Sequence, residues 1–253
     1  MTTSYVAAME AIAREAGALL KDFFSRRIGY EYKGDVDLVT EADRNSEKLI
    51  IERIRAQFPD HDIMGEEGGR RETGSAFRWY VDPLDGTTNF AHSFPHFAVS
   101  IALAYEAQVI VGVVYDPLRD ELFSVERDGT PTRDGAPIHC STRDDLATAL
   151  VGTGFGYDAD VRRAQAAVAA ALLPDVRDLR RLGSAAIDLC WTACGRLDAY
   201  YEHGLNAWDL AAGRLLCERA GLEVHDLAPV GPSGPGVLVS PPALSAPLLA
   251  RLA

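Results

Sequence analysis

Two aspartates in the segment Trp79–Phe90, WYVDPLDGTTNF, are the residues of this chain whose type and spacing most directly suggest chemistry. Asp82 and Asp85 stand three positions apart, directly after a β-rich run that ends at Val81. The proline between them fixes its own φ and pushes Asp82 toward an extended backbone, and the glycine after Asp85 permits a sharp turn. We therefore expect two carboxylates to converge at the end of a strand, where their hard oxygen ligands suit Mg²⁺.

The residues after this pair favour binding of a phosphate. Thr87, Thr88 and Asn89 are good helix-start residues. The free backbone N–H groups of such a turn favour a phosphate oxygen. Asp-Pro and Asp-Gly are also common turn dipeptides, so either pair alone is typical of a purely structural turn. The whole segment is much more specific than its parts.

Three further acidic clusters stand elsewhere in the chain. Glu66 and Glu67 precede a glycine-rich loop, Asp209 opens an apolar helix, and Asp43 follows Thr40 at the spacing of a capping box. Each has a structural alternative: a solvated surface, an acid favoured by the helix dipole, or a cap. It is their combination that favours a metal-dependent site.

The elements that must position these residues follow from hydrophobic spacing. Apolar residues at helical intervals predict a helix over 5–27 and a second from about Glu41 to Gln57, with Thr40 as its N-cap. A hairpin is expected to turn at Glu106–Gln108. Further strands are predicted over 78–81, 98–105, 109–115, 121–125, 148–153, 176–181, 197–201, 222–226 and 236–240, and further helices over 160–172, 184–194, 208–220 and 242–252.

Composition limits the class of protein. A chain of 253 residues with 47% hydrophobic and 25% charged residues can bury a full core as one α/β domain or two intimate subdomains. Its net charge, 25 − 37 = −12, disfavours nucleic-acid backbones and anionic membranes as partners. The N-terminal helix carries charges where a signal peptide is apolar, and the four cysteines lack a zinc-site spacing. We expect a cytoplasmic protein.

Several of these motifs together resemble the inositol monophosphatase family of Mg²⁺-dependent, lithium-sensitive phosphatases. The resemblance covers nearly the whole chain, and its segments are Lys33–Asp43, Glu66–Glu67, Asp82–Phe90, Phe94–Ser100, Gly183–Ala186, Asp198–Glu202 and Trp208–Gly213. It implies an α/β (α+β) fold, a layered αβαβα sandwich of the sugar phosphatase type. It further implies a single catalytic domain over 1–253, with possible subdomains 1–145 and 146–253 and the site between the two halves.

The resemblance also implies a set of metal ligands. Glu66, Asp82 and the backbone carbonyl of Leu84 would hold a first Mg²⁺ ion. Asp82, Asp85 and Asp209 would hold a second. A third, weaker ion is expected near Glu66, which makes two to three ions in each site.

The phosphate is expected to lie against these ions and the amides of Gly86 and Thr87. Thr87 and Glu66 would orient a metal-bound water for in-line attack on phosphorus, and Asp43 would support Thr87 through a hydrogen bond. Direct attack by water needs no covalent intermediate. Phosphate-ester hydrolysis is very slow without catalysis, and paired metal ions address that barrier by neutralising charge and activating water.

The alcohol half of the substrate is less closely specified. By resemblance, Glu202, Gly183, Ser184 and Ala185 line the inositol pocket, and Asp85 also contacts a ring hydroxyl. A carboxylate has lone pairs enough to accept from two sugar hydroxyls, although a surface glutamate at a strand end is the structural alternative for Glu202.

The favoured activity is hydrolysis of myo-inositol 1-phosphate, a small-molecule ester, by an inositol-phosphate phosphatase. Fructose 1,6-bisphosphate and histidinol phosphate are alternatives within the same chemistry, and 3′-phosphoadenosine 5′-phosphate is a weaker one. Members of the family are commonly dimers, so a homodimer is expected. The alternative of a different kind is a regulatory, protein-binding role, as some bacterial relatives have with the transcription machinery.

Overall fold

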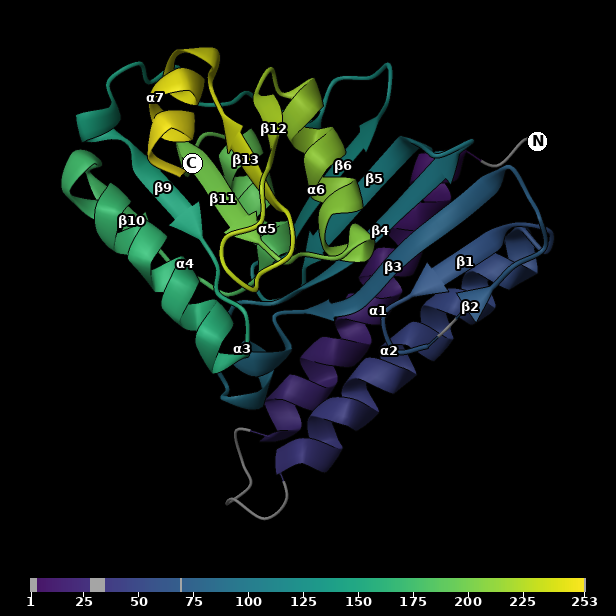
Figure 1. Cartoon of the computed structure of the whole chain (residues 1–253). Helices are drawn as coiled ribbons and strands as arrows, with labels where there is room; N and C mark the ends of the chain where they lie inside the picture. The colour runs from purple at the N-terminus through teal and green to yellow at the C-terminus, as the bar shows by residue number, and fades with distance from the viewer. Residues whose placement is uncertain (1–3, 28–34, 69, 253) are drawn as a thin grey trace.

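The computed structural model describes residues 4–27, 35–68 and 70–252. Its elements stack as alternating layers of helix and sheet (Figure 1). The helices are α1 (Tyr5–Arg27), α2 (Asp35–Gln57), α3 (Thr87–Ala91), α4 (Ala159–Leu172), α5 (Ala185–Ala193), α6 (Ala207–Arg219) and α7 (Pro242–Leu252), with short 3₁₀ turns at Leu146–Thr148 and Leu173–Asp175. The strands are β1 (Asp62–Gly65), β2 (Arg70–Arg71), β3 (Phe77–Asp85), β4 (Ala98–Tyr105), β5 (Gln108–Asp116), β6 (Glu121–Glu126), β7 (Thr132–Arg133), β8 (Ala136–Pro137), β9 (Leu150–Thr153), β10 (Asp178–Arg180), β11 (Ala199–His203), β12 (Glu223–Leu227) and β13 (Gly236–Ser240).

The first half of the chain forms an eight-stranded sheet in the order β2-β1-β3-β4-β5-β6-β7-β8. It is antiparallel except where β1 runs parallel to β3. The predicted hairpin between β4 and β5 is confirmed, and Glu106 and Ala107 turn it with positive φ angles of 48° and 71°. The second half forms a five-stranded sheet in the order β10-β9-β11-β13-β12.

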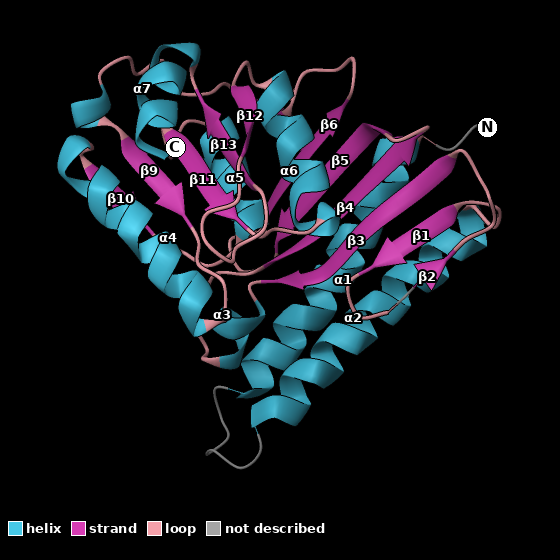
Figure 2. Ribbon diagram, viewed as in Figure 1, coloured by secondary structure: helices cyan, strands magenta, loops and turns pink. Residues whose placement is uncertain are grey.

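Helices α1 and α2 cover the outer face of the large sheet (Figure 2). The helical spacing read from the sequence is the cause, since Met9, Ile12 and Leu20 recur on one face of α1 and are almost fully buried. Each such side chain contributes about 1.5–3 kcal/mol when it leaves water. The first predicted helix is therefore confirmed, with matching bounds.

The predicted start of the second helix was wrong. Helix α2 begins at Asp35, so Thr40 lies inside it and is not its N-cap, and the capping box with Asp43 does not apply. Acidic residues at positions 35 and 37 suit the positive end of the helix dipole, which favours this earlier start. As a result, Asp43 projects from the body of the helix and not from its first turn.

Helices α5 and α6 form the layer between the two sheets, where a second apolar core lies. Helices α4 and α7 cover the outer face of the small sheet over a third core. The order of layers is thus helix, sheet, helix, sheet, helix, and the predicted αβαβα sandwich is confirmed. In the described ranges no helix is long and apolar enough to cross a membrane, and the four cysteines are free thiols.

Candidate active site

A β-bulge in β3 brings the two aspartates of the central motif to one side of the strand. Asp82 pairs with Ser100 and Asp85 with Ala98, so three positions along β3 match two along β4. Residues three apart on a regular strand point to opposite faces, and the extra residue of a bulge reverses that alternation. The strand therefore continues through Asp85 rather than ending at Val81, and the two carboxylates still converge, as predicted.

Strand β1 delivers Glu66 to the same place. The backbone N–H of Glu66 donates to the carbonyl of Val81 over 3.2 Å, which extends the parallel pairing of β1 with β3 by one residue. Glu66 thus stands beside the bulge, directly after its strand ends. Burial raises the pKa of Glu66, and the negative charges of Asp85, Glu67 and Glu47 raise it further.

The turn after Asp85 accepts only glycine. Gly86 has a φ of 93°, and a side chain there would come within 2.9 Å of the carbonyl of His96 and 3.2 Å of the carbonyl of Gly183. The chain then enters α3, whose first residue, Thr87, donates its hydroxyl to the Leu84 carbonyl over 3.0 Å. Backbone amides and a hydroxyl therefore stand next to the acidic pair.

The second half of the chain completes the site through α5 and α6. Asp209 occupies the first turn of α6, and its Oδ2 accepts from the backbone N–H of Asn206 over 2.6 Å. Asp85 accepts at its own Oδ2 from the Ser184 hydroxyl over 2.6 Å and from the Ala186 amide over 2.7 Å. These bonds engage Oδ2 of each aspartate, and the Oδ1 atoms take no part in them.

Ten of the twelve predicted site residues line one hollow of about 240 Å³. Those of the predicted site residues that line it are Glu66, Asp82, Leu84, Asp85, Gly86, Thr87, Gly183, Ala185, Glu202 and Asp209. Asp209 is more than a hundred positions from Asp82, so this meeting depends on the layered fold. The convergence expected from the sequence is present.

Two predicted residues stand outside the lining. Ser184 is buried behind the hollow and contacts Asp85. Asp43 is 3% exposed, and its Oδ1 has no hydrogen-bond partner among the described residues. The bond from Asp43 to Thr87 stays a prediction, since the Thr87 hydroxyl donates to Leu84. Lys33, at the start of one family-like segment, lies outside the described residues.

The carboxylates of the hollow raise one another's pKa. Burial raises the pKa of Asp82 well above its ordinary value, and the negative charges of Asp85, Glu66 and Asp209 raise it further. Burial is also the main reason why the pKa of Asp85 and that of Asp209 rise to about 6 each. So many acids in one low-dielectric space favour either protonation or a bound cation.

The donor set suits a divalent cation. Carboxylates and a backbone carbonyl are the hard oxygen ligands that Mg²⁺ prefers, and a cation would relieve the mutual repulsion described above. In the described part of the chain, no three His, Cys, Asp or Glu side chains already stand as a cluster that could hold a metal ion.

Glu202 also lines the hollow. The Tyr200 hydroxyl donates to its Oε2, and the carboxylate packs so closely over Gly154 that a methyl group at position 154 would overlap it. Burial raises the pKa of Glu202 to about 8. At neutral pH the group is therefore mostly a neutral carboxylic acid, able to donate as well as accept hydrogen bonds.

Sequence reasoning missed several residues that line the hollow. They come from the loop after β9, from the last residue of β11 and from the loop after it: Phe155, Gly156, Tyr157, His203, Gly204, Leu205 and Asn206. Glycines at 154, 156 and 204, one to three positions after the predicted strands 148–153 and 197–201, were the available signal. Arg181 also lines the hollow.

The model of the inositol monophosphatase family matches residues 1–251 of the chain. This chain belongs to the inositol monophosphatase family. Within the family, it is 40% identical to the inositol monophosphatase of Mesembryanthemum crystallinum, covering 88% of this chain and 86% of that protein. It is 43% identical to the Nus factor SuhB of Pasteurella multocida, covering 85% and 82%. The solved inositol monophosphatase of Anabaena is 35% identical, with a TM-score of 0.84 over 98% of this chain and 94% of that chain.

Family membership confirms the resemblance found in the sequence and supports phosphatase activity. It does not by itself identify the ester or the ion. Relatives named inositol monophosphatase and relatives named Nus factor SuhB are similar to this chain to nearly the same degree.

Proposed function

We propose that this protein is a Mg²⁺-dependent phosphatase that hydrolyses myo-inositol 1-phosphate to myo-inositol and phosphate. The observation that carries the proposal is the meeting of Glu66, Asp82, Asp85 and Asp209 in one hollow, beside the Gly86 turn. Two or three ions in this site, and inhibition by lithium, belong to the same proposal.

A divalent cation held by these carboxylates and the Leu84 carbonyl would offset the charge of the phosphate and lower the pKa of a water molecule that it binds. The chain itself supplies the alignment. The amides of Gly86 and Thr87 hold phosphate oxygens, and Glu66 and the Thr87 hydroxyl orient the attacking water. The water oxygen bonds to phosphorus as the ester P–O bond breaks. The water gives up one proton and the leaving alkoxide takes one up, so the products are phosphate and the free alcohol.

The chemistry around Glu202 favours a polyol as the alcohol half of the substrate. Glu202 has a pKa of about 8 because it is buried, and a mostly neutral acid exchanges hydrogen bonds with hydroxyls. Histidinol phosphate would instead place an ammonium group there, for which an ionised carboxylate is the better partner. Gly183 and Ala185 complete this wall.

The test is a comparison of kcat/KM for myo-inositol 1-phosphate, fructose 1,6-bisphosphate, histidinol phosphate and 3′-phosphoadenosine 5′-phosphate. We expect the inositol ester to be preferred, with turnover that requires Mg²⁺ and is suppressed by Li⁺. A preference for histidinol phosphate would replace the substrate and keep the mechanism. Phosphate release that persists in excess chelator would rule out the metal-dependent mechanism as well.

A second candidate function is a regulatory, protein-binding role. The similarity to proteins named Nus factor SuhB favours it. The variant Asp209→Asn separates the two functions, since it removes a proposed ligand from the hollow and keeps its shape. Full cellular function of that variant, together with loss of phosphatase activity, would favour the partner role. A cytoplasmic location and a homodimer remain part of the proposal.

A further inference from the structure

The hollow is strongly acidic, and one cation faces its acids. Arg181 is the one arginine or lysine among the described residues that line it. His203 also lines it, but burial lowers the pKa of this histidine, so it carries little charge at neutral pH. A phosphate ester that enters the hollow therefore meets a single permanent positive charge of the protein.

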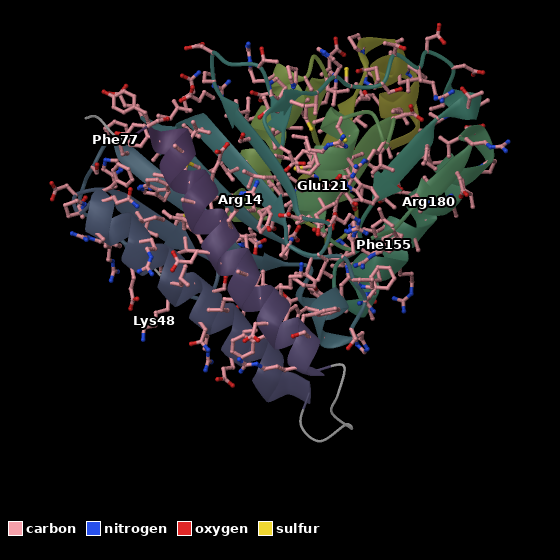
Figure 3. All side chains as sticks on the ribbon, turned by 180° about the vertical axis from the view of Figure 1, so that it is seen from behind. Arg14, Lys48, Phe77, Glu121, Phe155 and Arg180 are labelled. Carbon is pink, nitrogen blue, oxygen red and sulfur yellow. The ribbon has the colours of Figure 1, made fainter. Side chains whose placement is uncertain are left out.

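Arg181 is held across the mouth of the hollow. It lies between β10 and α5, and its Nη2 donates to the carbonyl of Phe155 over 3.4 Å. Figure 3 labels Phe155 and Arg180 to the right of α1. The Nη1 atom of Arg181 lies against Gly183, in the space that a side chain there would take. Gly183 in turn packs against Gly86, so the guanidinium stands close to the turn proposed to hold phosphate.

The guanidinium has not been neutralised by a neighbour. In the described part of the chain, Arg181 has no ion-pair partner, whereas the adjacent Arg180 is paired with Asp178 over 2.6 Å. The positive charge of Arg181 instead acts across the hollow, where it opposes the effect of burial on the pKa of Glu202. An exposed arginine at a substrate mouth, without a carboxylate of its own, is suited to an incoming anion.

We propose that Arg181 binds a phosphate group of the substrate at the mouth of the hollow, in addition to the cations held by the carboxylates. A guanidinium presents parallel N–H donors that match two phosphate oxygens, and such charged bonds are stronger than neutral ones. The inference rests on the proposed function and assigns it an additional binding residue. The phosphate is either the scissile group of a monoester or the second group of a bisphosphate.

The variants Arg181→Ala and Arg181→Lys test the inference, with Arg180→Ala as the matched control, because Arg180 is adjacent and outside the hollow. KM and kcat are measured for myo-inositol 1-phosphate and for fructose 1,6-bisphosphate, and the dissociation constant of inorganic phosphate is measured by calorimetry with Mg²⁺ present. Arg181→Ala is expected to weaken binding by about tenfold to about a hundredfold, with a much smaller change in kcat. Arg181→Lys recovers part of the loss.

The two sources of phosphate give different results. If Arg181 holds the scissile group, Arg181→Ala raises the KM of both esters and the dissociation constant of inorganic phosphate. If it holds a second phosphate, only the KM of the bisphosphate rises. Values within twofold of wild type in every assay would overturn the inference, as would a loss that disappears once variant and wild type are compared in the same oligomeric state by sedimentation. If the wild type hydrolyses no ester, the proposed function fails, and calorimetry with inorganic phosphate and with fructose 1,6-bisphosphate still decides on Arg181.

Discussion

The hydroxyl of Ser184 donates a 2.6 Å hydrogen bond to Oδ2 of Asp85, although the two residues are 99 positions apart. The same hydroxyl oxygen accepts from the Ile187 amide and so caps α5. Ser184 thereby connects the start of a helix in the second half of the chain to a proposed metal ligand in the first. A side chain outside the hollow positions a group inside it.

The variant Ser184→Ala removes both bonds. We expect a loss of about 0.5–2 kcal/mol in the free energy of unfolding, the usual range for an N-cap, together with weaker Mg²⁺ activation, because Asp85 loses a partner. Ser184→Thr keeps the hydroxyl and is the control. Urea unfolding and Mg²⁺ titrations of activity separate the two effects. A stability loss with unchanged Mg²⁺ activation would mean that Ser184 serves only as a cap.

Two isosteric variants test the proposed metal ligands. Asp85→Asn and Asp209→Asn each replace a charged oxygen ligand and keep the side-chain shape, so we expect normal circular dichroism and turnover reduced by at least about a hundredfold. Thr87→Ala should cost less, since water partly replaces one hydroxyl. A rate near that of the wild type at moderate Mg²⁺ in either Asn variant would refute the assignment of that residue.

A methyl group at position 154 should disturb only the binding of the substrate's alcohol group by Glu202. In Gly154→Ala the added methyl overlaps the Glu202 carboxylate, so we expect the KM for myo-inositol 1-phosphate to rise about tenfold, as it should in Glu202→Gln. Hydrolysis of p-nitrophenyl phosphate, which has no hydroxyl for Glu202, should be little changed. Gly129→Ala is a matched control, because its methyl would meet ordinary contacts of 3.4 Å. Equal losses on both esters would argue against this role of Glu202.

Acid stability should depend on Asp62, the first residue of β1. Hydrogen bonds from the backbone and hydroxyl of Thr73 lower the pKa of this buried carboxyl to about 2, from an ordinary value of 3.8. Because the pKa is lower in the folded state, the ionised carboxyl stabilises the fold at any pH above its pKa in the unfolded chain. That stabilisation is lost as the pH falls through the pKa of the folded protein. The wild type should therefore exceed Asp62→Asn in free energy of unfolding at pH 6, and by less at pH 3. A difference that does not change with pH would contradict the prediction.

Much of the fold could be predicted because its signals are local. The apolar stripe of α1 and the nearly continuous apolar runs of β4 and β5 each specify an element without reference to the rest of the chain. The short strands β1 and β2 could not be found this way, since four and two residues give no measurable period. The start of α2 was misplaced because Thr40 satisfies a capping rule that the helix does not use.

The site could be predicted in its parts but not in its assembly. The residue types and order of Asp82, Asp85 and Asp209 pointed to metal chemistry, and the family resemblance joined them. The bulge that turns Asp82 and Asp85 to one side depends on pairing with β4, and a single sequence does not encode that pairing locally. The aromatic residues Phe155 and Tyr157 stand in a loop whose position is set only by the layers around it.

The five layers place the proposed ion ligands on both sides of a seam. Glu66, Asp82 and Asp85 belong to the half that builds the large sheet, and Asp209 to the half that builds the small one. A cation bound by ligands from both halves would connect them, and its binding free energy would stabilise their association. Removing the ions would therefore weaken the contact between the halves before it weakens either sheet. The affinity of two separately produced halves for each other would rise with the metal concentration.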